Sequence, residues 1–239
     1  MDNKRDILTD LFSEAGISLS EKQVDLFLCY AALLEEWNQK MNLTAITAFE
    51  EVVQKHFIDS VYPFVLSEVN PAQTLLDMGS GAGFPGIPLK ILFPELKITL
   101  ADALNKRITF LKEVVSRLEL PNIEVIHTRA EDLGKNSQFR DQFDIVTARA
   151  VAPLNILAEY CLPFVRIGGV FLAYKSEKVE EELKTAQNAL KTLGAEEEKP
   201  YYYNLPGTET GRSLLVYRKT GITPLSYPRK AGTITKKPL

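Results

Sequence analysis

The stretch Thr74-Leu-Leu-Asp-Met-Gly-Ser-Gly-Ala-Gly-Phe-Pro-Gly86 decides how this chain folds. An apolar run ends at Asp77 and Met78, glycines follow at positions 79, 81, 83 and 86, and apolar residues then recur at helical spacing from Ile87. This order predicts a strand, a glycine loop and a helix. Glycine permits positive φ and carries no Cβ, so a ligand can lie against the backbone and face the amide N–H groups at the helix start. We therefore predict a nucleotide-type ligand site at this loop.

Two classes of ligand could use such a loop. The pattern Gly81-x-Gly83-x-x-Gly86 matches the fingerprint of dinucleotide-binding proteins. That fingerprint should begin where the strand ends, whereas here an earlier Gly79-x-Gly81 pair displaces it. The carboxylate of Asp77, just before the turn, would repel a pyrophosphate but suits S-adenosylmethionine, which carries an ammonium and a sulfonium group and no phosphate. We favour S-adenosylmethionine, with an NAD-linked oxidoreductase and a ligand-free tight turn as the alternatives.

The composition of the chain indicates a soluble globular protein. Its 239 residues, 45% hydrophobic and 25% charged, allow one sizeable α/β domain and a small additional module. No apolar run approaches the ~18 residues of a membrane-spanning helix, and the charged start, residues 1–6, lacks the apolar core of a signal peptide. Cys29 and Cys161 form neither a disulfide framework nor a metal site. We expect a cytoplasmic protein without membrane contact or bound metal.

The charge of the chain is unevenly distributed. The net charge is −3, yet residues 218–239 carry six basic side chains and no acidic one, so the preceding residues carry −9. An acidic body with a basic end indicates an anionic partner at one face. A merely solvated terminal segment would have the same composition, and both interpretations remain open at this point.

Residues 1–70 are expected to be helical. Ser20-x-x-Gln23 is a capping box that opens a long helix with one apolar face. A second helical segment, about 49–66, places His56 and Asp59 on one face. A hydrogen-bonded structural contact between those two side chains is the simpler interpretation of the pair.

After Pro71 strands and helices alternate, which predicts a doubly wound, mostly parallel α/β sheet with an antiparallel addition. We predict a helical subdomain at 1–70, a Rossmann-like domain at 71–220 and a basic tail at 221–239. Helices are expected at 106–118, 154–161 and 177–193. The strands are expected at 74–78, 97–102, 123–127, 143–148 and 170–174, with a terminal hairpin formed by 199–205 and 212–219.

Ligands of such sheets lie at the carboxyl ends of the strands. Asp102 ends the second strand, 23 residues after Gly79, where its carboxylate can accept both ribose hydroxyls of an adenosine or cap the following helix. The segment Arg129–Asp132 follows the third strand and is placed to border an adenine ring. Arg149 ends the fourth strand, where its guanidinium can bind an anionic group or form a surface salt bridge.

Several motifs occur together in this chain: Trp37-Asn38, Asn42-Leu43-Thr44, His56-Phe57-x-Asp59-Ser60, the loop Gly79–Pro88, Lys106-Arg107, Arg129-Ala130-Glu131, Thr147-Ala148-Arg149-Ala150 and Tyr227-Pro228-Arg229-Lys230-x-Gly232. Their combination resembles the bacterial ribosomal RNA small-subunit methyltransferase G family, also called glucose-inhibited division protein B, over nearly the whole chain. The glycine loop alone is shared with many methyltransferases. The chain departs from the family pattern at Ala231 and Ile234, where prolines are usual, and this bears on the stiffness of the tail.

The resemblance implies a class I S-adenosylmethionine-dependent methyltransferase that methylates N7 of a guanosine in a conserved decoding-region loop of 16S rRNA. It also implies cofactor contacts by Gly79, Phe84, Asp102, Ala130, Glu131 and Arg149. Beside these we expect contacts from Asp77, Gly81, Ala103 and Leu104. A monomer acting on 16S rRNA, on the small ribosomal subunit or on its assembly intermediate is expected.

Guanine N7 presents a free lone pair at neutral pH, so the reaction needs alignment and charge control more than a general base. In agreement, the sequence contains no convincing catalytic base, nucleophile or metal cluster. We expect the N-terminal helices and the basic tail to hold an unpaired RNA loop through salt-sensitive phosphate contacts. The predicted RNA-binding residues are Lys106, Arg107, Arg229, Lys230, Lys236 and Lys237. A small-molecule methyltransferase, or a non-catalytic ribosome-binding factor with a retained pocket, would also be compatible with these features.

Overall fold

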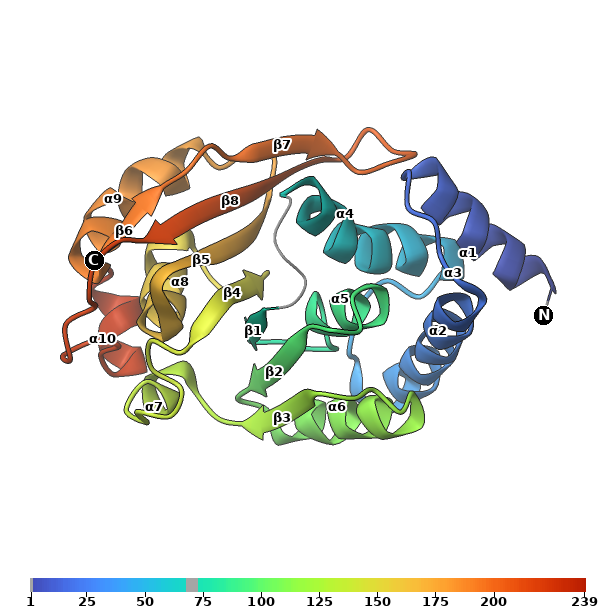
Figure 1. Cartoon of the computed structure of the whole chain (residues 1–239), viewed down its shortest axis with the longest axis horizontal. Helices are drawn as coiled ribbons and strands as arrows, with labels where there is room; N and C mark the ends of the chain where they lie inside the picture. The colour runs from blue at the N-terminus through green and yellow to red at the C-terminus, as the bar shows by residue number, and fades with distance from the viewer. Residues whose placement is uncertain (1, 68–72) are drawn as a thin grey trace.

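The computed structural model describes residues 2–67 and 73–239, and Pro71, at which the alternation was expected to begin, lies outside them. Over the described residues the core of the molecule is a mixed sheet with the strand order β3-β2-β1-β4-β5-β8-β6, and β7 also pairs with β8 (Figure 1). The strands are β1 (Thr74–Met78), β2 (Lys97–Asp102), β3 (Ile123–His127), β4 (Phe143–Arg149), β5 (Val165–Ser176), β6 (Ala195–Glu197), β7 (Tyr201–Asn204) and β8 (Gly211–Lys219).

Strands β1 to β5 are parallel, and β8 turns antiparallel beside β5. From β1 the chain proceeds outward through β2 to β3 and then returns to place β4 on the opposite side of β1. The sheet order therefore reverses between β1 and β4. In open α/β sheets the crevice outside the carboxyl ends of the strands at such a point is where ligands bind.

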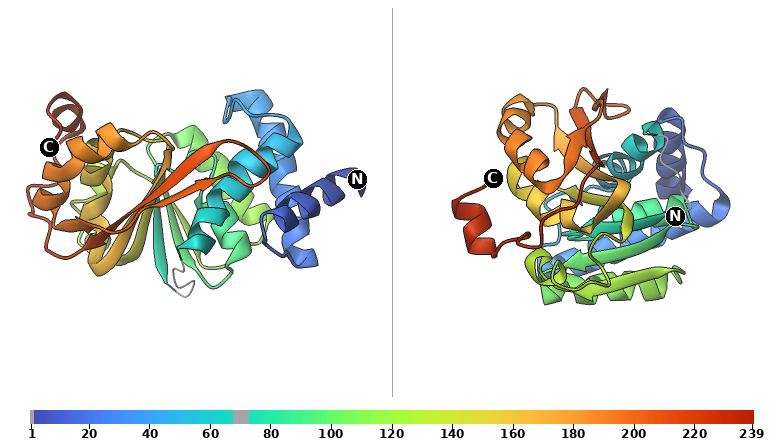
Figure 2. Two further views of the ribbon diagram at one scale, coloured as in Figure 1. Left: turned by 90° about the horizontal axis from the view of Figure 1, so that it is seen from above. Right: turned by 60° about the vertical axis from the view of Figure 1, so that its left-hand side comes forward.

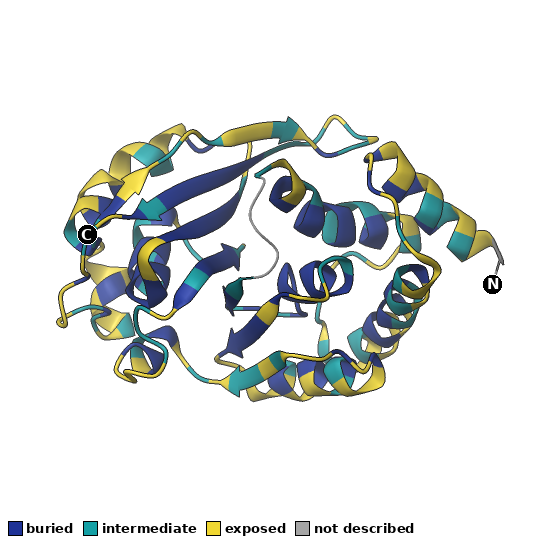
Figure 3. Ribbon diagram, in the orientation of Figure 1, coloured by how far each residue is buried: buried dark blue, intermediate teal, exposed yellow. Residues whose placement is uncertain are grey.

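Helices cover both faces of the sheet (Figure 2), and the alternation of buried side chains along the strands supplies two apolar layers. The first layer lies under α1 (Asp2–Glu14), α2 (Glu21–Met41), α3 (Phe49–Val52), the π-helical turn η1 (Val53–Ile58), α4 (Asp59–Leu66), α5 (Gly86–Leu92) and α6 (Asn105–Arg117). The second layer lies under α7 (Ala130–Leu133), α8 (Leu154–Cys161), the 3₁₀ turn η2 (Leu162–Phe164) and α9 (Glu180–Leu193). Figure 3 shows the central strands buried and the outer faces of α6 and α9 exposed.

The predicted capping box is confirmed and also ties α2 to the sheet helices. The Gln23 N–H donates to the Ser20 hydroxyl at 3.4 Å, and the Gln23 side-chain oxygen accepts the Ser20 N–H at 2.9 Å. The Gln23 side-chain amide then donates to the carbonyls of Ile91 and Leu92, both at 3.1 Å. The N-terminal helices share one continuous apolar core with α5 and α6. The predicted boundary between a helical subdomain and a Rossmann-like domain near residue 70 remains a prediction. The apolar core includes residues from both sides of it.

Three of the predicted strands, β1, β2 and β3, have the expected bounds, whereas β5 is longer than expected. The strand was expected at 170–174, but β5 starts at Val165 and includes Gly168 and Gly169. The register between β4 and β5 shifts between Phe143 and Ile145, and Gly168 has φ +82°. Glycine thus marks an irregularity inside a strand here and not a turn before it.

The basic C-terminal segment, expected as a tail, is fastened to the body of the protein. The Arg140 guanidinium donates to the carbonyls of Thr223 and Tyr227, both at 2.7 Å. Arg229 makes a bidentate ion pair with Glu159, in which Nη2 and Oε2 are 2.6 Å apart, and Glu159 is completely buried in α8. A further helix, α10 (Ala231–Lys236), packs Ile234 against the body. Arg229 was also predicted to bind RNA, which remains a prediction; in the structure its side chain anchors the segment to Glu159.

We expect Arg229→Ala to lower the free energy of unfolding by roughly 3 to 5 kcal/mol, because it leaves the buried Glu159 carboxylate without its counter-charge. Denaturant unfolding followed by circular dichroism measures this loss. Arg117→Ala is the matched control, because Arg117 is exposed and pairs with Glu113 across one helical turn at 3.7 Å; its cost should stay below about 1 kcal/mol. Equal losses in the two variants would contradict the anchoring role.

Candidate functional site

The glycine loop after β1 adopts a conformation that requires glycine. Gly79, Gly81 and Gly83 have φ values of +76°, +61° and +97°. A Cβ on Gly79 would lie 2.7 Å from Val151 Cγ2, and one on Gly83 would lie 2.6 Å from Ile87 Cγ1. A Cβ on Gly81 would meet nothing closer than 3.9 Å. The loop is therefore packed tightly at Gly79 and Gly83 and open at Gly81, which is the shape of a cradle against which a ligand can lie.

Asp77 supports this loop from beneath. Its side chain is fully buried, and Oδ2 accepts the N–H of Gly86 at 3.0 Å. Burial raises the pKa of the Asp77 carboxyl to about 7, although the Gly86 N–H and the charge of Arg149 favour its ionised form. No described residue donates a hydrogen bond to Oδ1. Asp77 thus holds the start of α5, and its predicted contact with a cofactor remains a prediction.

A cavity of about 180 Å³ lies beside the loop, and we call it the loop cavity. It is bordered by the ends of β1 and β2, by the turn after β3 and, from the C-terminal segment, by Ala231. Of the predicted cofactor residues, the structure brings five together in its wall: Gly79, Asp102, Ala103, Ala130 and Glu131. Leu104, also predicted, follows directly and is 54% exposed. The carboxyl ends of neighbouring strands supply this convergence, as expected for a parallel sheet.

Asp102 links the loop cavity to the glycine loop. Its Oδ2 accepts the Gly81 N–H at 2.9 Å and lies 3.3 Å from Arg107 Nη1, and its Oδ1 accepts the Leu104 N–H at 2.9 Å. An ionised carboxylate offers about four acceptor positions, so Asp102 keeps one for a further donor. The sequence left two roles open for Asp102, ribose binding and capping of the following helix. In the structure Asp102 accepts a hydrogen bond from the Leu104 N–H just before α6 and also lines the cavity.

Two other predicted cofactor residues, Phe84 and Arg149, meet outside the wall of the loop cavity. The Arg149 guanidinium carbon lies 4.9 Å from the centroid of the Phe84 ring. Its Nη1 is 3.1 Å from Asp59 Oδ2 and donates to the Lys55 carbonyl at 3.4 Å. Val151, two residues further along the chain, lines the loop cavity. Arg149, at the end of β4, therefore binds the N-terminal helices, while Val151 two residues later borders the loop cavity.

His56 completes this cluster and is held neutral. It lies in the π-helical turn η1, a form of helix that is frequent at functional sites, and stacks on Phe84 with centroids 4.5 Å apart. Burial, together with the smaller effect of the nearby charge of Arg149, lowers the pKa of His56 to about 3. His56 Nδ1 accepts from Arg149 at 3.3 Å, so Nε2–H donates to the Thr44 hydroxyl at 2.7 Å. His56 and Asp59 were expected to form a pair; in the structure both bind Arg149.

A second cavity, of about 430 Å³, opens beside this cluster, and we call it the arginine pocket. The charged side chains in its wall are Lys55, Asp59, Arg149, Lys175 and Arg212, and its tyrosines are Tyr174 and Tyr203. Arg212 lies 153 positions from Asp59, whose Oδ1 is 3.1 Å from Arg212 Nε. Arg212 was not predicted as a site residue, because nothing in the local pattern of β8 distinguishes this arginine from Arg218 in the same strand.

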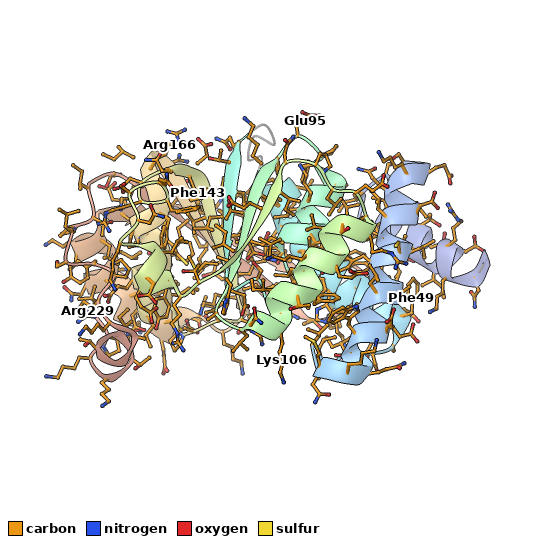
Figure 4. The ribbon with its side chains drawn as sticks, turned by 90° about the horizontal axis from the view of Figure 1, so that it is seen from below. Phe49, Glu95, Lys106, Phe143, Arg166 and Arg229 are labelled. Carbon is orange, nitrogen blue, oxygen red and sulfur yellow. The ribbon has the colours of Figure 1, made fainter. Side chains whose placement is uncertain are left out.

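The predicted RNA-binding residues lie toward the carboxyl edge of the strands. Figure 4 places Lys106 and Arg229 toward one side of the molecule and Glu95 and Arg166 at the opposite side. Arg107 lies 3.3 Å from Asp102 Oδ2 at the start of α6. The remaining four lysines are exposed: Lys106, Lys230, Lys236 and Lys237. Their contact with RNA remains a prediction, with Arg229 set apart because Glu159 occupies its guanidinium.

Within residues 2–67 and 73–239 no group of three or more histidine, cysteine or acidic side chains could hold a metal ion. None of the helices in that part of the chain is long and apolar enough to cross a membrane.

Comparison with known sequences gives one consistent family. The family model described as rRNA small subunit methyltransferase G matches residues 23–204. A protein named ribosomal RNA small subunit methyltransferase G from an Exiguobacterium species is 51% identical over 224 residues, which is 94% of each chain. Proteins of the same name from Lachnoclostridium phytofermentans and a Thermoanaerobacter species are 52% and 49% identical, over 94% and 100% of this chain and 93% and 100% of their own.

Comparison with solved structures confirms the predicted doubly wound α/β fold. A ribosomal protein L11 methylase from Lactobacillus delbrueckii superimposes with a TM-score of 0.52 at 15% identity, covering 68% of this chain and 77% of that one. The M. jannaschii protein TYW2, solved in complex with AdoMet, superimposes with a TM-score of 0.51 at 17% identity, covering 64% of this chain and 71% of its own. At these identities the likeness concerns the fold.

We expect the ionisation of Asp77 to leave a signature in the pH dependence of stability. Because its pKa is raised from about 4 to about 7, the folded chain binds more protons than the unfolded chain between these values. Its contribution to the free energy of unfolding therefore falls as pH rises from about 4 to 7, by on the order of 3 to 4 kcal/mol.

Chemical denaturation of the wild type and of Asp77→Asn at several pH values checks this expectation, since the amide variant lacks the fall. His56 acts in the opposite direction over a similar pH range but is present in both proteins, so it cancels in the difference. Asp10→Asn, at an exposed position of α1, is the control and should follow the wild type. Identical pH profiles for wild type and Asp77→Asn would refute the raised pKa.

Proposed function

Because the chain belongs to the rRNA small subunit methyltransferase G family, we propose that it transfers a methyl group from S-adenosylmethionine to N7 of a guanosine in a conserved decoding-region loop of 16S rRNA. The observation that carries the proposal is identity near 50% to relatives of that name over at least 94% of this chain. Membership of the family itself implies an RNA substrate from the small ribosomal subunit.

The wall of the loop cavity fits S-adenosylmethionine and not a dinucleotide. Asp102 and Glu131 both contribute carboxylates to the wall, which suits ribose hydroxyls and an exocyclic amine and would repel a pyrophosphate. Asp77 adds a third carboxyl group beneath the loop. When bound, S-adenosylmethionine supplies the electrophilic methyl group. The open space at Gly81 and the remaining acceptor position of Asp102 are the features of this chain that would receive it.

The histidine beside the glycine loop aligns groups and does not remove protons. His56 stacks on Phe84, and both of its ring nitrogens already have partners. With a pKa of about 3 it accepts no proton near neutral pH. This agrees with guanine N7, whose lone pair is free to attack without deprotonation. The chemistry therefore rests on positioning and on the electrostatic field at the carboxyl edge of the sheet.

The RNA is expected to approach along the same edge. Lys106 at the start of α6 is exposed on that side of the molecule (Figure 4), and three lysines of the C-terminal segment are also exposed: Lys230, Lys236 and Lys237. Lysine ammonium groups neutralise phosphates and release counterions, so binding should weaken steeply with added salt. A monomer acting in the cytoplasm on naked 16S rRNA, the assembled subunit or an assembly intermediate is part of the proposal.

Methyl transfer to 16S rRNA is the direct test. Unmodified 16S rRNA incubated with the protein and tritiated S-adenosylmethionine should incorporate label, and nucleoside analysis should recover it as N7-methylguanosine. Gly79→Val should abolish incorporation, because the backbone at position 79 has a positive φ that valine adopts only with strain, and the added side chain would collide with Val151. Label in no nucleoside, with transfer instead to a small molecule in a cell extract, would favour a small-molecule methyltransferase.

Cofactor affinity tests the role of Asp102 separately from RNA. We expect Asp102→Asn to raise the dissociation constant for S-adenosylmethionine about 10- to 100-fold, because the amide loses a charged acceptor in a buried wall. Isothermal titration calorimetry measures this change. Asp10→Asn is the control for the same chemical substitution at an exposed site. Tight binding of NAD by the wild type, without a response to S-adenosylmethionine, would overturn the choice of cofactor.

A further inference from the structure

The arginine pocket has more positive charge in its wall than the protein neutralises. Lys55 pairs with Glu51 at 2.5 Å, and Lys175 pairs with Glu182 at 2.7 Å. The two remaining cations, Arg149 and Arg212, share a single carboxylate on Asp59.

The surplus charge is permanent near neutral pH. His56, which also faces the pocket, is neutral there, and an arginine side chain does not deprotonate in proteins. Within the wall of the pocket, two guanidinium groups face the one carboxylate of Asp59, which leaves one positive charge without a counter-charge there. A partly buried charge without a counter-charge is costly, so the pocket is suited to an anionic ligand.

The two arginines differ in position and in free bonding capacity. Arg149 is nearly enclosed, 13% exposed, and each of its terminal nitrogens already has a partner. Arg212 is 25% exposed; its Nε faces Asp59 and its Nη1 donates to the Gly211 carbonyl. No described residue accepts a hydrogen bond from Arg212 Nη2. A guanidinium fork that is held by Asp59 and keeps a free nitrogen is a typical binding group for phosphate.

Two oxyanions could meet this pocket, namely the carboxylate of the methyl donor and a phosphate of the RNA. On the proposed function, the carboxylate of the methyl donor is expected near the glycine loop, where the Arg149 guanidinium lies over the Phe84 ring. Arg212 enters the pocket from β8, which is joined to the sheet on the far side of β5 from the loop strand β1. Both arginines share Asp59, but Arg212 is the more exposed of the two and keeps a terminal nitrogen without a described partner. This difference favours RNA phosphate as the group that reaches Arg212.

We propose that the arginine pocket binds a backbone phosphate at the nucleotide to be methylated, with Arg212 as the phosphate ligand and Asp59 as the positioning residue that orients it. The inference rests on the proposed function, because it assumes an RNA substrate. The phosphate contact fixes the nucleotide relative to Phe84 and the glycine loop. Arg212 thereby contributes to binding of the RNA and not to binding of the methyl donor.

Arg212→Gln is the test variant, and Arg218→Gln is its matched control. Both arginines lie in β8 and both pair with a carboxylate, but Arg218 pairs with Glu198, away from the pocket. We expect Arg212→Gln to raise KM for unmodified 16S rRNA at least tenfold and to leave the dissociation constant for S-adenosylmethionine within about twofold. Arg218→Gln should change neither quantity.

The salt dependence of RNA binding distinguishes a phosphate contact by Arg212 from a purely structural role, because a structural role would not change its slope. Filter binding of a labelled 16S rRNA transcript, without methyl donor, gives log K against log salt concentration for each protein. Loss of one phosphate contact should reduce the slope by about 0.7 for a single-stranded site. Arg212→Lys keeps the charge and should retain most of that slope, and it serves as the second variant if the glutamine variant does not fold.

The outcomes separate the two proposals. An unchanged KM and an unchanged slope in Arg212→Gln, with normal methylation by the wild type, overturn the inference and leave the function intact. Weakened S-adenosylmethionine binding with normal RNA affinity also overturns it, since the pocket would then hold the donor carboxylate. A reduced slope in a protein whose wild type methylates no RNA supports the phosphate contact and counts against the proposed function.

Discussion

Two carboxylates at the ends of neighbouring strands hold the glycine loop, and the site depends on them. Asp102 at the end of β2 accepts the Gly81 N–H, and Asp77 near the end of β1 accepts the Gly86 N–H. The loop has positive φ at Gly79, Gly81 and Gly83, and the Tyr30 hydroxyl also donates to its Ala82 carbonyl. Asp102, together with Glu131 in the cavity wall, makes the surroundings of the loop acidic, whereas Asp77 is only partly ionised near pH 7. A cationic donor is compatible with that field, and a pyrophosphate is not.

Arg149 joins the N-terminal helices to this loop. It is the last residue of β4, stacks on Phe84 and binds Asp59 and His56, which come from α4 and η1. Because His56 accepts a hydrogen bond from a guanidinium and is buried, it stays neutral, and the cluster has a fixed pattern of donors and acceptors across the neutral pH range. The helical extension is therefore part of the site, and its apolar core is continuous with that of α5 and α6.

The C-terminal segment borders the site in a way that its composition does not indicate. A basic end suggested an arm that meets RNA, and three exposed lysines remain available for that role. Yet Arg229 is occupied by the buried Glu159, Arg140 holds the backbone of residues 223–227, and Ala231 reaches the wall of the loop cavity. Of the basic side chains of the segment, Arg229 thus anchors it to the body, and the three lysines remain at the surface.

The sequence alone determined the local elements and the class of site. Strands β1 to β3, the capping box of α2 and the glycine loop follow from patterns within about ten residues, because apolar periodicity and backbone requirements act locally. The partners of the charged side chains were decided only by the tertiary structure. Asp59 with Arg149 and Arg212, and Glu159 with Arg229, are joined across 90, 153 and 70 positions. An arginine in a strand has the same local pattern whether it faces solvent or a pocket, and only the packing of the sheet against the helices determines which carboxylate it meets.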